Sequence, residues 1–338
     1  MSDLSEKPSH DSALKDSYNR RIDYLRISIT DKCNLQCVYC VSAAGLKYFR
    51  NSEIMTDEEI VRLVRIAHKH GLRKVRITGG EPLLRKSIVD LVSSIKKIGI
   101  SDLSLTTNGI MLAGLAGALK EAGLDRVNIS LDTMKAERYR EITKKGDIAR
   151  VLEAIKEAER VGLSPVKINI VPIRGINDDE ILSFASLTFE KDYHIRFIEF
   201  MPVTSDGMWR REKCVSAKEI LETISGLGEL ESFKFRGEGP SRNYRLQGAV
   251  GVIGIISPIS DHFCNSCNRL RLTSNGKIRP CLFSKIEVDI KAPMRNGADD
   301  DEIERLFLYT VSIKPERHKL DENITASDHI KNMSKIGG

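Results

Sequence analysis

The chain has 338 residues, of which 41% are hydrophobic and 30% are charged, and this composition excludes a disordered or fibrous protein. The net charge of +6 is too diluted over this length to indicate nucleic-acid binding, although it is compatible with an anionic small molecule. The longest nearly apolar run, Gly248 to Pro258, is much shorter than the roughly 20 residues that cross a bilayer, and the N-terminus does not resemble a signal peptide. We therefore expect a cytosolic protein without membrane association, whose seven cysteines stay reduced.

Short β-branched runs alternate with helical patterns over the first two thirds of the chain. Residues 1–20 precede this region and are polar without hydrophobic periodicity, so we expect a loose extension there. The alternation over residues 21–210 predicts parallel strands joined by right-handed crossovers. Six runs are expected to be strands, namely YLRISIT, KVRITGG, DLSLTTNG, RVNISLD, VKINIVP and IRFIEFM.

Two of the intervening helices can be predicted from their ends. Thr56 and Glu59 form a capping box, an apolar stripe begins at Ile60, and Gly71 follows the last turn. A helix over residues 150–161 has the same plan.

Polar and aliphatic residues alternate within the predicted strands, which is unusual for a parallel sheet covered on both faces. The aliphatic residues are expected to pack under helices, so the other face must be wet or filled by a polar ligand. The polar partners that share this face are Arg26 and Ser28, Arg76 and Thr78, Ser104 and Thr106, Asn128 and Ser130, and Lys167 and Asn169. The pattern predicts an incomplete (β/α)6 TIM-like barrel with a polar lumen, because a closed (β/α)8 barrel is filled with bulky apolar residues. An open sheet with a solvent-exposed polar face is the alternative.

Beyond about residue 210 the alternation ends. The stretches FKFRGEG, NYRLQG and VGVIGIISPIS indicate short strands and turns, and residues 299–312 are expected to be helical after an acidic start. We therefore expect a smaller α+β domain over residues 211–338.

Three cysteines, Cys33, Cys37 and Cys40, lie within the ten residues DKCNLQCVYC. Three thiolates can hold an iron–sulfur cluster and leave one iron open, as a catalytic zinc site keeps one position open. A zinc site is the alternative, but it needs a fourth Cys or His that this loop does not offer.

This spacing resembles the Cys-x3-Cys-x2-Cys signature of radical S-adenosylmethionine enzymes. The resemblance implies a 4Fe-4S cluster whose open iron binds S-adenosylmethionine, and cleavage of that cofactor to a 5′-deoxyadenosyl radical. It further implies that the cofactor contacts Tyr39, Gly80 in TGGEPLL, Ser130 in NISLD and Met201 in EFMP. Taken alone, Met201 is more typical of a core residue.

A second set, Cys264, Cys267 and Cys281, lies near Arg269 and Arg271 in the sequence CNSCNRLR. This combination is similar to the radical S-adenosylmethionine enzymes of molybdenum cofactor biosynthesis, in which a second 4Fe-4S cluster binds the guanine base of GTP. A Cys3His zinc site that includes His262 is the alternative.

The narrower resemblance implies that the radical removes hydrogen from C3′ of GTP and that the carbon radical attacks C8. The product would be (8S)-3′,8-cyclo-7,8-dihydroguanosine 5′-triphosphate, which a cyclic pyranopterin monophosphate synthase would use. The implied GTP-binding residues are Arg26, Arg76, Thr106, Lys167, Arg269 and Arg271. The implied catalytic residues are Arg26, Arg269, Arg271, Gly337 and Gly338. The two glycines are included because the family's Gly-Gly tail reaches the active site. A surface ion pair is the alternative for any single arginine, and a frayed end is the alternative for the tail.

The family usually has Met-Pro after the first cluster loop, where this chain has Val41 and Ser42. Cys214 matches no motif and is expected to be a buried structural thiol. Two rival functions remain open, a peptide-modifying maturase with an auxiliary cluster and a zinc-stabilised module without catalysis. A reductant protein would be required, and a homodimer is the default expectation for assembly.

Overall fold

The structure is a computed structural model, and it describes residues 14–40, 48–202, 208–233, 239–318 and 333–336. All six predicted strands are present and parallel, each joined to the next by one or two helices. The strands are β1 (Tyr24–Ser28), β2 (Lys74–Thr78), β3 (Asp102–Thr107), β4 (Arg126–Ser130), β5 (Lys167–Ile170) and β6 (His194–Ile198). The helices between them are α1 (Asp57–Lys69), α2 (Ile88–Lys97), α3 (Ala116–Glu121), α4 (Ala136–Thr143), α5 (Ile148–Arg160) and α6 (Ile181–Glu190).

The predicted start of α1 is confirmed. The Thr56 hydroxyl accepts from the Glu59 amide at 3.2 Å, and the Glu59 carboxylate accepts from the Thr56 amide at 2.8 Å. Ile60 opens the buried stripe. The chain leaves the helix at Gly71, whose φ of 93° is easily reached only without a side chain.

The remaining strands extend the same sheet at both edges, and further helices accompany them. They are α7 (Ala217–Ser225), β7 (Leu230–Phe233), β8 (Arg242–Leu246), β9 (Val252–Ile256), β10 (Arg269–Leu272), β11 (Lys277–Arg279), β12 (Val288–Asp289), α8 (Lys291–Arg295), α9 (Asp300–Ser312) and α10 (Met333–Ile336). Short 3-10 turns cover η1 (Asn51–Glu53), η2 (Pro82–Leu84), η3 (Asp178–Glu180), η4 (Arg211–Lys213) and η5 (Cys264–Ser266).

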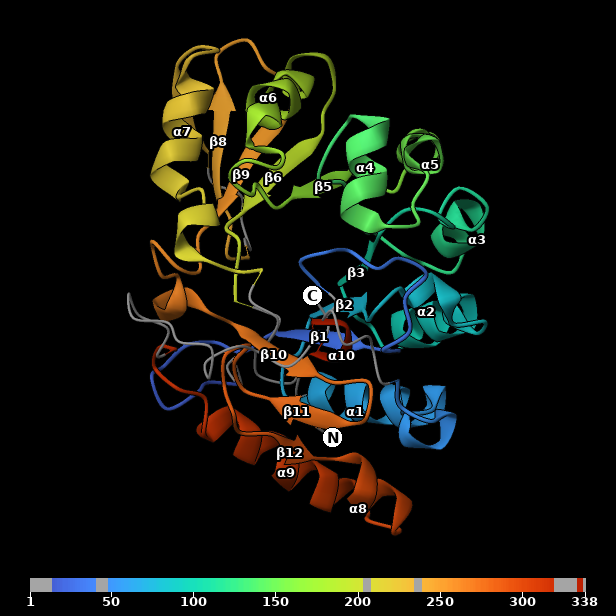
Figure 1. Ribbon diagram of the computed structural model, residues 1–338. Coiled ribbons are helices and arrows are strands. Elements are labelled where there is room, and N and C mark those ends of the chain that lie inside the picture. Colours follow the sequence, from blue (N-terminus) through green and yellow to red (C-terminus); the bar gives the residue numbers. More distant parts are fainter. Residues whose placement is uncertain (1–13, 41–47, 203–207, 234–238, 319–332, 337–338) are drawn as a thin grey trace, which may run out of the picture.

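The resulting 12-stranded sheet has the order β12-β11-β10-β1-β2-β3-β4-β5-β6-β9-β8-β7. Strand β9 pairs in parallel with β6, and β10 pairs in parallel with β1, so the C-terminal part of the chain supplies both edges of the partial barrel (Figure 1). The predicted α+β character of this part is confirmed, but its strands do not form a sheet of their own among the described residues. The predicted boundary near residue 210 stays a prediction.

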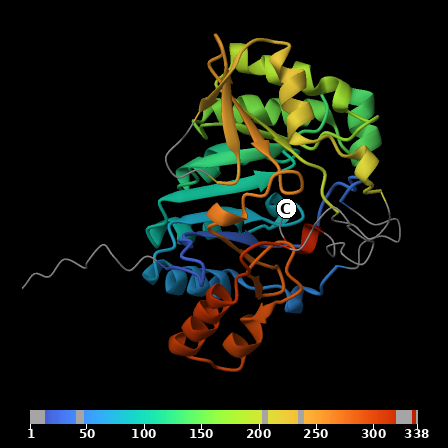
Figure 2. The same ribbon diagram turned by 90° about the vertical axis from the view of Figure 1, so that its left-hand side faces the viewer.

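The two faces of the sheet differ as the alternation predicts. Aliphatic side chains such as Leu25, Ile27, Val75 and Ile77 are completely buried in the main core. Helices α1 to α6 cover this outer face (Figures 1 and 2). The opposite face carries the polar side chains and lines a cavity, so the half-open barrel is confirmed over an open sheet with a solvent-exposed polar face.

The expectation of a loose N-terminal extension is wrong for residues 14–20. The Ile22 amide donates to the Leu14 carbonyl at 2.8 Å, and the buried side chains of Asp16 and Arg20 form an ion pair at 2.6 Å. Local polarity suggested disorder because the partners of this segment lie far away in the chain. Residues 1–13 lie outside the described residues. Nowhere in the described ranges does a helix have the length and apolar character needed to cross a bilayer.

Candidate active site

A cavity of about 780 Å³ lies on the inner face of the barrel, and all six predicted cysteine ligands line it. The first set follows the C-terminal end of β1. The second set lies toward the opposite end, because Cys267 just precedes β10 and Arg269 on β10 pairs with Tyr24 at the start of β1. The two cysteine sets therefore face one shared cavity from opposite ends of one strand.

The first cysteine loop is fastened to helix α4. The amides of Gln36 and Val38 donate to the carbonyls of Thr143 and Ile142 at 3.0 and 2.9 Å. Burial raises the pKa of the Cys37 thiol well above its usual range, and the neighbouring Cys40, Asp132 and Cys33 raise it further. Three thiols crowded in this way require a positive centre to stay ionised, and the iron of a cluster supplies one. The loop thus fits the 4Fe-4S cluster. Val41 and Ser42, where the chain departs from the family, lie outside the described residues.

The two glycines of TGGEPLL allow this loop to approach the end of β2. A Cβ on Gly80 would lie 2.2 Å from the Lys32 carbonyl oxygen, and one on Gly79 would lie 2.5 Å from the Thr30 carbonyl oxygen. Both glycines also line the cavity, as the resemblance implies for Gly80. Their missing side chains therefore accommodate the cysteine loop, in addition to any cofactor in the cavity.

Glu81 of the same motif is fully buried and fastens the loop after β3. Its carboxylate accepts from the Thr107 hydroxyl at 2.7 Å and from the Asn108 amide at 2.8 Å. Burial raises the pKa of Glu81 to about 7, although these donors oppose the shift.

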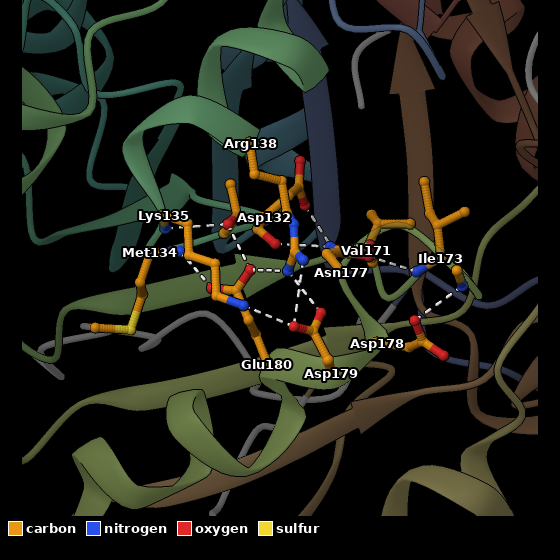
Figure 3. A network of polar contacts seen from close by, with 12 residues as sticks. Asp132, Met134, Lys135, Arg138, Val171, Ile173, Asn177, Asp178, Asp179 and Glu180 are labelled. Carbon is orange, nitrogen blue, oxygen red and sulfur yellow. Dashed lines mark hydrogen bonds and ion pairs between the residues drawn. The ribbon is translucent and has the colours of Figure 1, made fainter.

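Tyr39 is held by Asp132, which belongs to a polar network with Val171, Asn177 and Glu180 (Figure 3). Its hydroxyl donates to one carboxylate oxygen of Asp132, and the other oxygen accepts from the Val171 amide at 2.8 Å. The Asn177 side chain donates to the Asp132 carbonyl at 2.6 Å. The Glu180 carboxylate accepts from the two residues after Asp132, from the Thr133 hydroxyl at 2.5 Å and from the Met134 amide at 2.7 Å. The network fixes the aromatic ring beside Cys40.

The other residues expected to contact S-adenosylmethionine also line the cavity. Ser130 is the last residue of β4, and Met201 follows β6. Met201 additionally packs against Ile336 of α10, so both its expected contact and its packing alternative have a basis. Met333 of α10 lines the cavity as well, which brings the C-terminal helix to its wall. Gly337 and Gly338 lie outside the described residues.

A cluster of cations faces the cavity. Arg26, Arg76, Lys167, Arg269 and Arg271 all line it. Burial lowers the pKa of Arg271 to about 9 and that of Arg26 well below its usual range, and neighbouring arginines lower both further. Such mutual repulsion is relieved by an anion.

Further basic groups that line the cavity were missed from the sequence. They include Arg126, His194, Arg196 and Arg245. Burial lowers the pKa of His194 to about 3, and the charges of Lys167 and Arg196 lower it further. The strand alternation could have revealed Arg126 and Arg196, which lie two residues before Asn128 and two before Ile198 on the inward face.

Several buried polar atoms in the cavity have no hydrogen-bond partner among the described residues. They include the Thr106 hydroxyl, the Asn169 side-chain oxygen, the Tyr24 hydroxyl and Nε of Arg245. Buried polar atoms are normally paired, so these atoms fit a polar ligand that supplies donors and acceptors.

The second cysteine set lies in a more positive environment than the first. Burial would raise the pKa of the Cys267 thiol, but the charges of Arg269 and Lys314 and hydrogen bonds from Arg269 lower it to about 6. A thiol with a pKa of about 6 is mostly ionised at neutral pH and is therefore ready to bind iron, so this set also fits a cluster.

The zinc alternative gains no support from His262. One ring nitrogen of His262 lies 2.9 Å from the Pro258 carbonyl oxygen, and the ring packs edge-on against His318. Within the described ranges, no three His, Cys, Asp or Glu side chains form a site for a single metal ion. Cys214 does not line the cavity, and its thiol donates to the Phe200 carbonyl at 3.5 Å, as a structural thiol would, but the residue is only partly buried rather than buried as expected.

Sequence comparisons agree with this geometry. The chain matches the Radical SAM superfamily over residues 27–188 and Molybdenum Cofactor Synthesis C over residues 193–320. A protein of Pelotomaculum thermopropionicum named GTP 3′,8-cyclase is 47% identical over 328 residues, covering 96% of this chain and 100% of that protein. A protein of the same name from Moorella thermoacetica is 48% identical over 327 residues, with 96% and 100% covered.

Among solved structures, Streptococcus suis SuiB bound to S-adenosylmethionine is similar, with a TM-score of 0.62 and 17% identity. The match covers 80% of this chain and 64% of SuiB, and at this identity it supports the fold alone. The superfamily match and the full-length relatives show that the partial barrel, with three cysteines after its first strand, is that of a radical S-adenosylmethionine enzyme. Within this class, the chain belongs to the GTP 3′,8-cyclase family.

Proposed function

We propose that the protein converts GTP to (8S)-3′,8-cyclo-7,8-dihydroguanosine 5′-triphosphate with S-adenosylmethionine as cofactor, the first step of molybdenum cofactor biosynthesis. The observation that carries this proposal is that both cysteine sets face one shared, cation-lined cavity. The names of the full-length relatives support the same reaction. A cyclic pyranopterin monophosphate synthase would use the product, and a reductant protein would supply electrons.

Cys33, Cys37 and Cys40 would hold the first 4Fe-4S cluster beside the S-adenosylmethionine site. When bound, the cluster and this cofactor supply a 5′-deoxyadenosyl radical to the cavity. Tyr39, Gly80, Ser130 and Met201 would position the cofactor, and the bond between Tyr39 and Asp132 would keep the ring in place.

Cys264, Cys267 and Cys281 would hold a second 4Fe-4S cluster that receives the guanine base. The charges of Arg26, Arg76, Lys167, Arg269 and Arg271 would neutralise the triphosphate, because guanidinium groups bind phosphate in a bidentate manner. Thr106 would contribute its unpaired hydroxyl. A base and a phosphate chain bound at separate points leave the ribose between them little freedom, which favours reaction at one carbon.

The walls must also exclude water and other hydrogen donors from the reacting ribose. Helix α10 packs with Ile336 on Met201, Leu282 and Phe283, which supports a role of the adjoining Gly337 and Gly338 in completing the site. Arg26, Arg269 and Arg271 would hold the nucleotide so that its reacting atoms stay in place, which is the catalytic role that we assign to them. We place the reaction in the cytoplasm, because all seven cysteines are free thiols.

The test is an anaerobic incubation with GTP, S-adenosylmethionine and dithionite, followed by mass analysis of the products. Cys37→Ala should abolish formation of 5′-deoxyadenosine. Cys267→Ala should still cleave S-adenosylmethionine but give no cyclised nucleotide. Cys214→Ala, which removes a thiol outside the cavity, should behave as the unchanged protein. Cyclised nucleotide from either cluster variant would contradict the proposal, and zinc without sulfide in the purified protein would favour the non-catalytic module.

A further inference from the structure

Lys314 is a buried lysine that contacts the chain beside two of the second-set cysteines. The residue comes shortly after helix α9 in the sequence and is only 2% exposed. The ammonium donates to the carbonyls of Arg269 and Pro280, each at 2.8 Å, and to the thiol sulfur of Cys267 at 3.5 Å. These three acceptors use all three donors of the ammonium. Pro280 directly precedes Cys281, so one side chain ties together the two segments that carry Cys267 and Cys281.

Arg20 holds the third cysteine of the set in a similar way. Its guanidinium donates to the Cys264 carbonyl at 2.9 Å and to the carbonyls of Glu316 and Pro315 at 2.6 and 2.7 Å. Its Nε forms the buried ion pair with Asp16 at 2.6 Å. Arg20 therefore links Cys264 to the segment that begins with Lys314.

The cost of burying these cations indicates what they are for. Removing an ammonium from water is unfavourable unless charge and hydrogen bonds compensate for it. Among the ion pairs of the described residues, Asp16 balances Arg20 but no carboxylate balances Lys314. The ammonium instead lies 3.5 Å from the Cys267 sulfur and contacts Pro280, the residue before Cys281. An anionic thiolate set at this position would supply the missing compensation.

We propose that Lys314 and Arg20 are positioning residues that preform the second three-cysteine set, and that Lys314 raises the reduction potential of the cluster held there. The inference rests on the proposed function, because it assumes that the second set binds a cluster. A hydrogen bond to a cluster sulfur and a nearby positive charge both favour the reduced, more negative state. Loss of Lys314 should therefore weaken cluster retention and make reduction harder.

The experiment uses the full chain with C33A, C37A and C40A, so that any remaining cluster belongs to the second set. Iron and sulfide are measured after anaerobic reconstitution, and the potential is measured by a redox titration followed by EPR. In this background, Lys314→Met should lose most of the about four irons that a 4Fe-4S cluster contains. Lys314→Gln keeps hydrogen-bond donors without the charge, so it should retain more iron but titrate at a lower potential.

Two matched controls test whether position matters more than charge. Lys277→Met removes a lysine of β11 whose ammonium pairs with Glu287, and it should keep the iron and the potential. Arg20→Met should lose iron, whereas Arg21→Met, at an exposed neighbour, should not. Full iron with an unchanged potential in Lys314→Met would overturn the inference.

A measurement without substitution at residue 314 covers the case in which the variants fail to fold. Protein labelled with [15N]lysine, in the same background, should show a 15N coupling to the reduced cluster in pulsed EPR. If the cluster is present and no such coupling is seen, the contact and the inference are wrong while the proposed function stands. If the intact second set holds no iron at all, the proposed second cluster fails, and the inference fails with it.

Discussion

Replacing Gly80 by alanine is the most direct test of how the first cysteine loop is positioned. The new Cβ would lie 2.2 Å from the Lys32 carbonyl oxygen and 2.6 Å from its carbon, whereas ordinary contact begins at 3.4 Å. The backbone of Lys32, next to Cys33, must therefore move by about 1.2 Å, the difference between 3.4 and 2.2 Å. This movement weakens the bonds from the Gly80 amide to Thr30 at 2.7 Å and from the Glu81 amide to Lys32 at 2.8 Å.

The expected cost combines overpacking with these two hydrogen bonds, roughly 3 kcal/mol of unfolding free energy in urea. A displacement of about 1 Å near the reacting centre should also slow S-adenosylmethionine cleavage by about 10²-fold. Gly117→Ala is the matched control, because nothing lies within 4 Å of its Cβ position in helix α3. It should stabilise the protein by about 0.5–1 kcal/mol. A Gly80→Ala protein with unchanged stability and a full first cluster would refute the steric reasoning.

Three further changes test other parts of the cavity. Lys167→Met should weaken GTP binding at least about tenfold in calorimetric titration, since it removes a charged phosphate contact, whereas exposed Lys191→Met should not; equal affinities would contradict an anion site at Lys167. Because His194 has a pKa of about 3 in the fold, its unfolded form binds an extra proton below about pH 6.5, so the unfolding free energy should fall as pH drops from there toward 3, by up to about 1.4 kcal/mol per pH unit. His194→Gln should flatten this slope in urea titrations and leave stability above pH 7 independent of pH; an identical slope would show that His194 titrates normally. Tyr39→Phe leaves a buried oxygen of Asp132 without its hydroxyl donor and should cost about 1–3 kcal/mol in urea at neutral pH, and a neutral substitution would mean that the bond contributes no net stability.

The strands and the cation-lined face could be predicted because polar and aliphatic residues alternate along each strand and so mark its two faces. Each inward side chain between Arg26 and Lys167 follows from that alternation, and so would Arg196 had the pattern been continued into β6. Arg245 could not be found in this way, since β8 reaches the cavity only through its pairing with β9. Lys314 and Arg20 were also beyond reach, because Arg20 binds Cys264 across 244 residues and no local pattern encodes such a contact.

Residues 14–20 also show that local sequence does not reveal long-range contacts. Their polarity predicted a loose chain, yet the charges that suggested disorder are the ones that are buried. Asp16 and Arg20 satisfy each other, and Arg20 then satisfies carbonyls near the end of the described chain. Composition reports the cost of burying a charge but not whether a distant partner compensates for it.

The two-sided attachment of the C-terminal strands has a consequence for synthesis of the protein. As the chain leaves the ribosome, β1 forms one margin of the growing sheet, and its neighbour β10 is about 245 residues away. Until that stretch emerges, the unpaired N–H and C=O groups of β1 can template pairing with another nascent chain. Long-range closure of this kind also slows folding. A protein ending before β9 would leave β6 unpaired too, so we expect truncated chains to aggregate rather than persist as a working half-barrel.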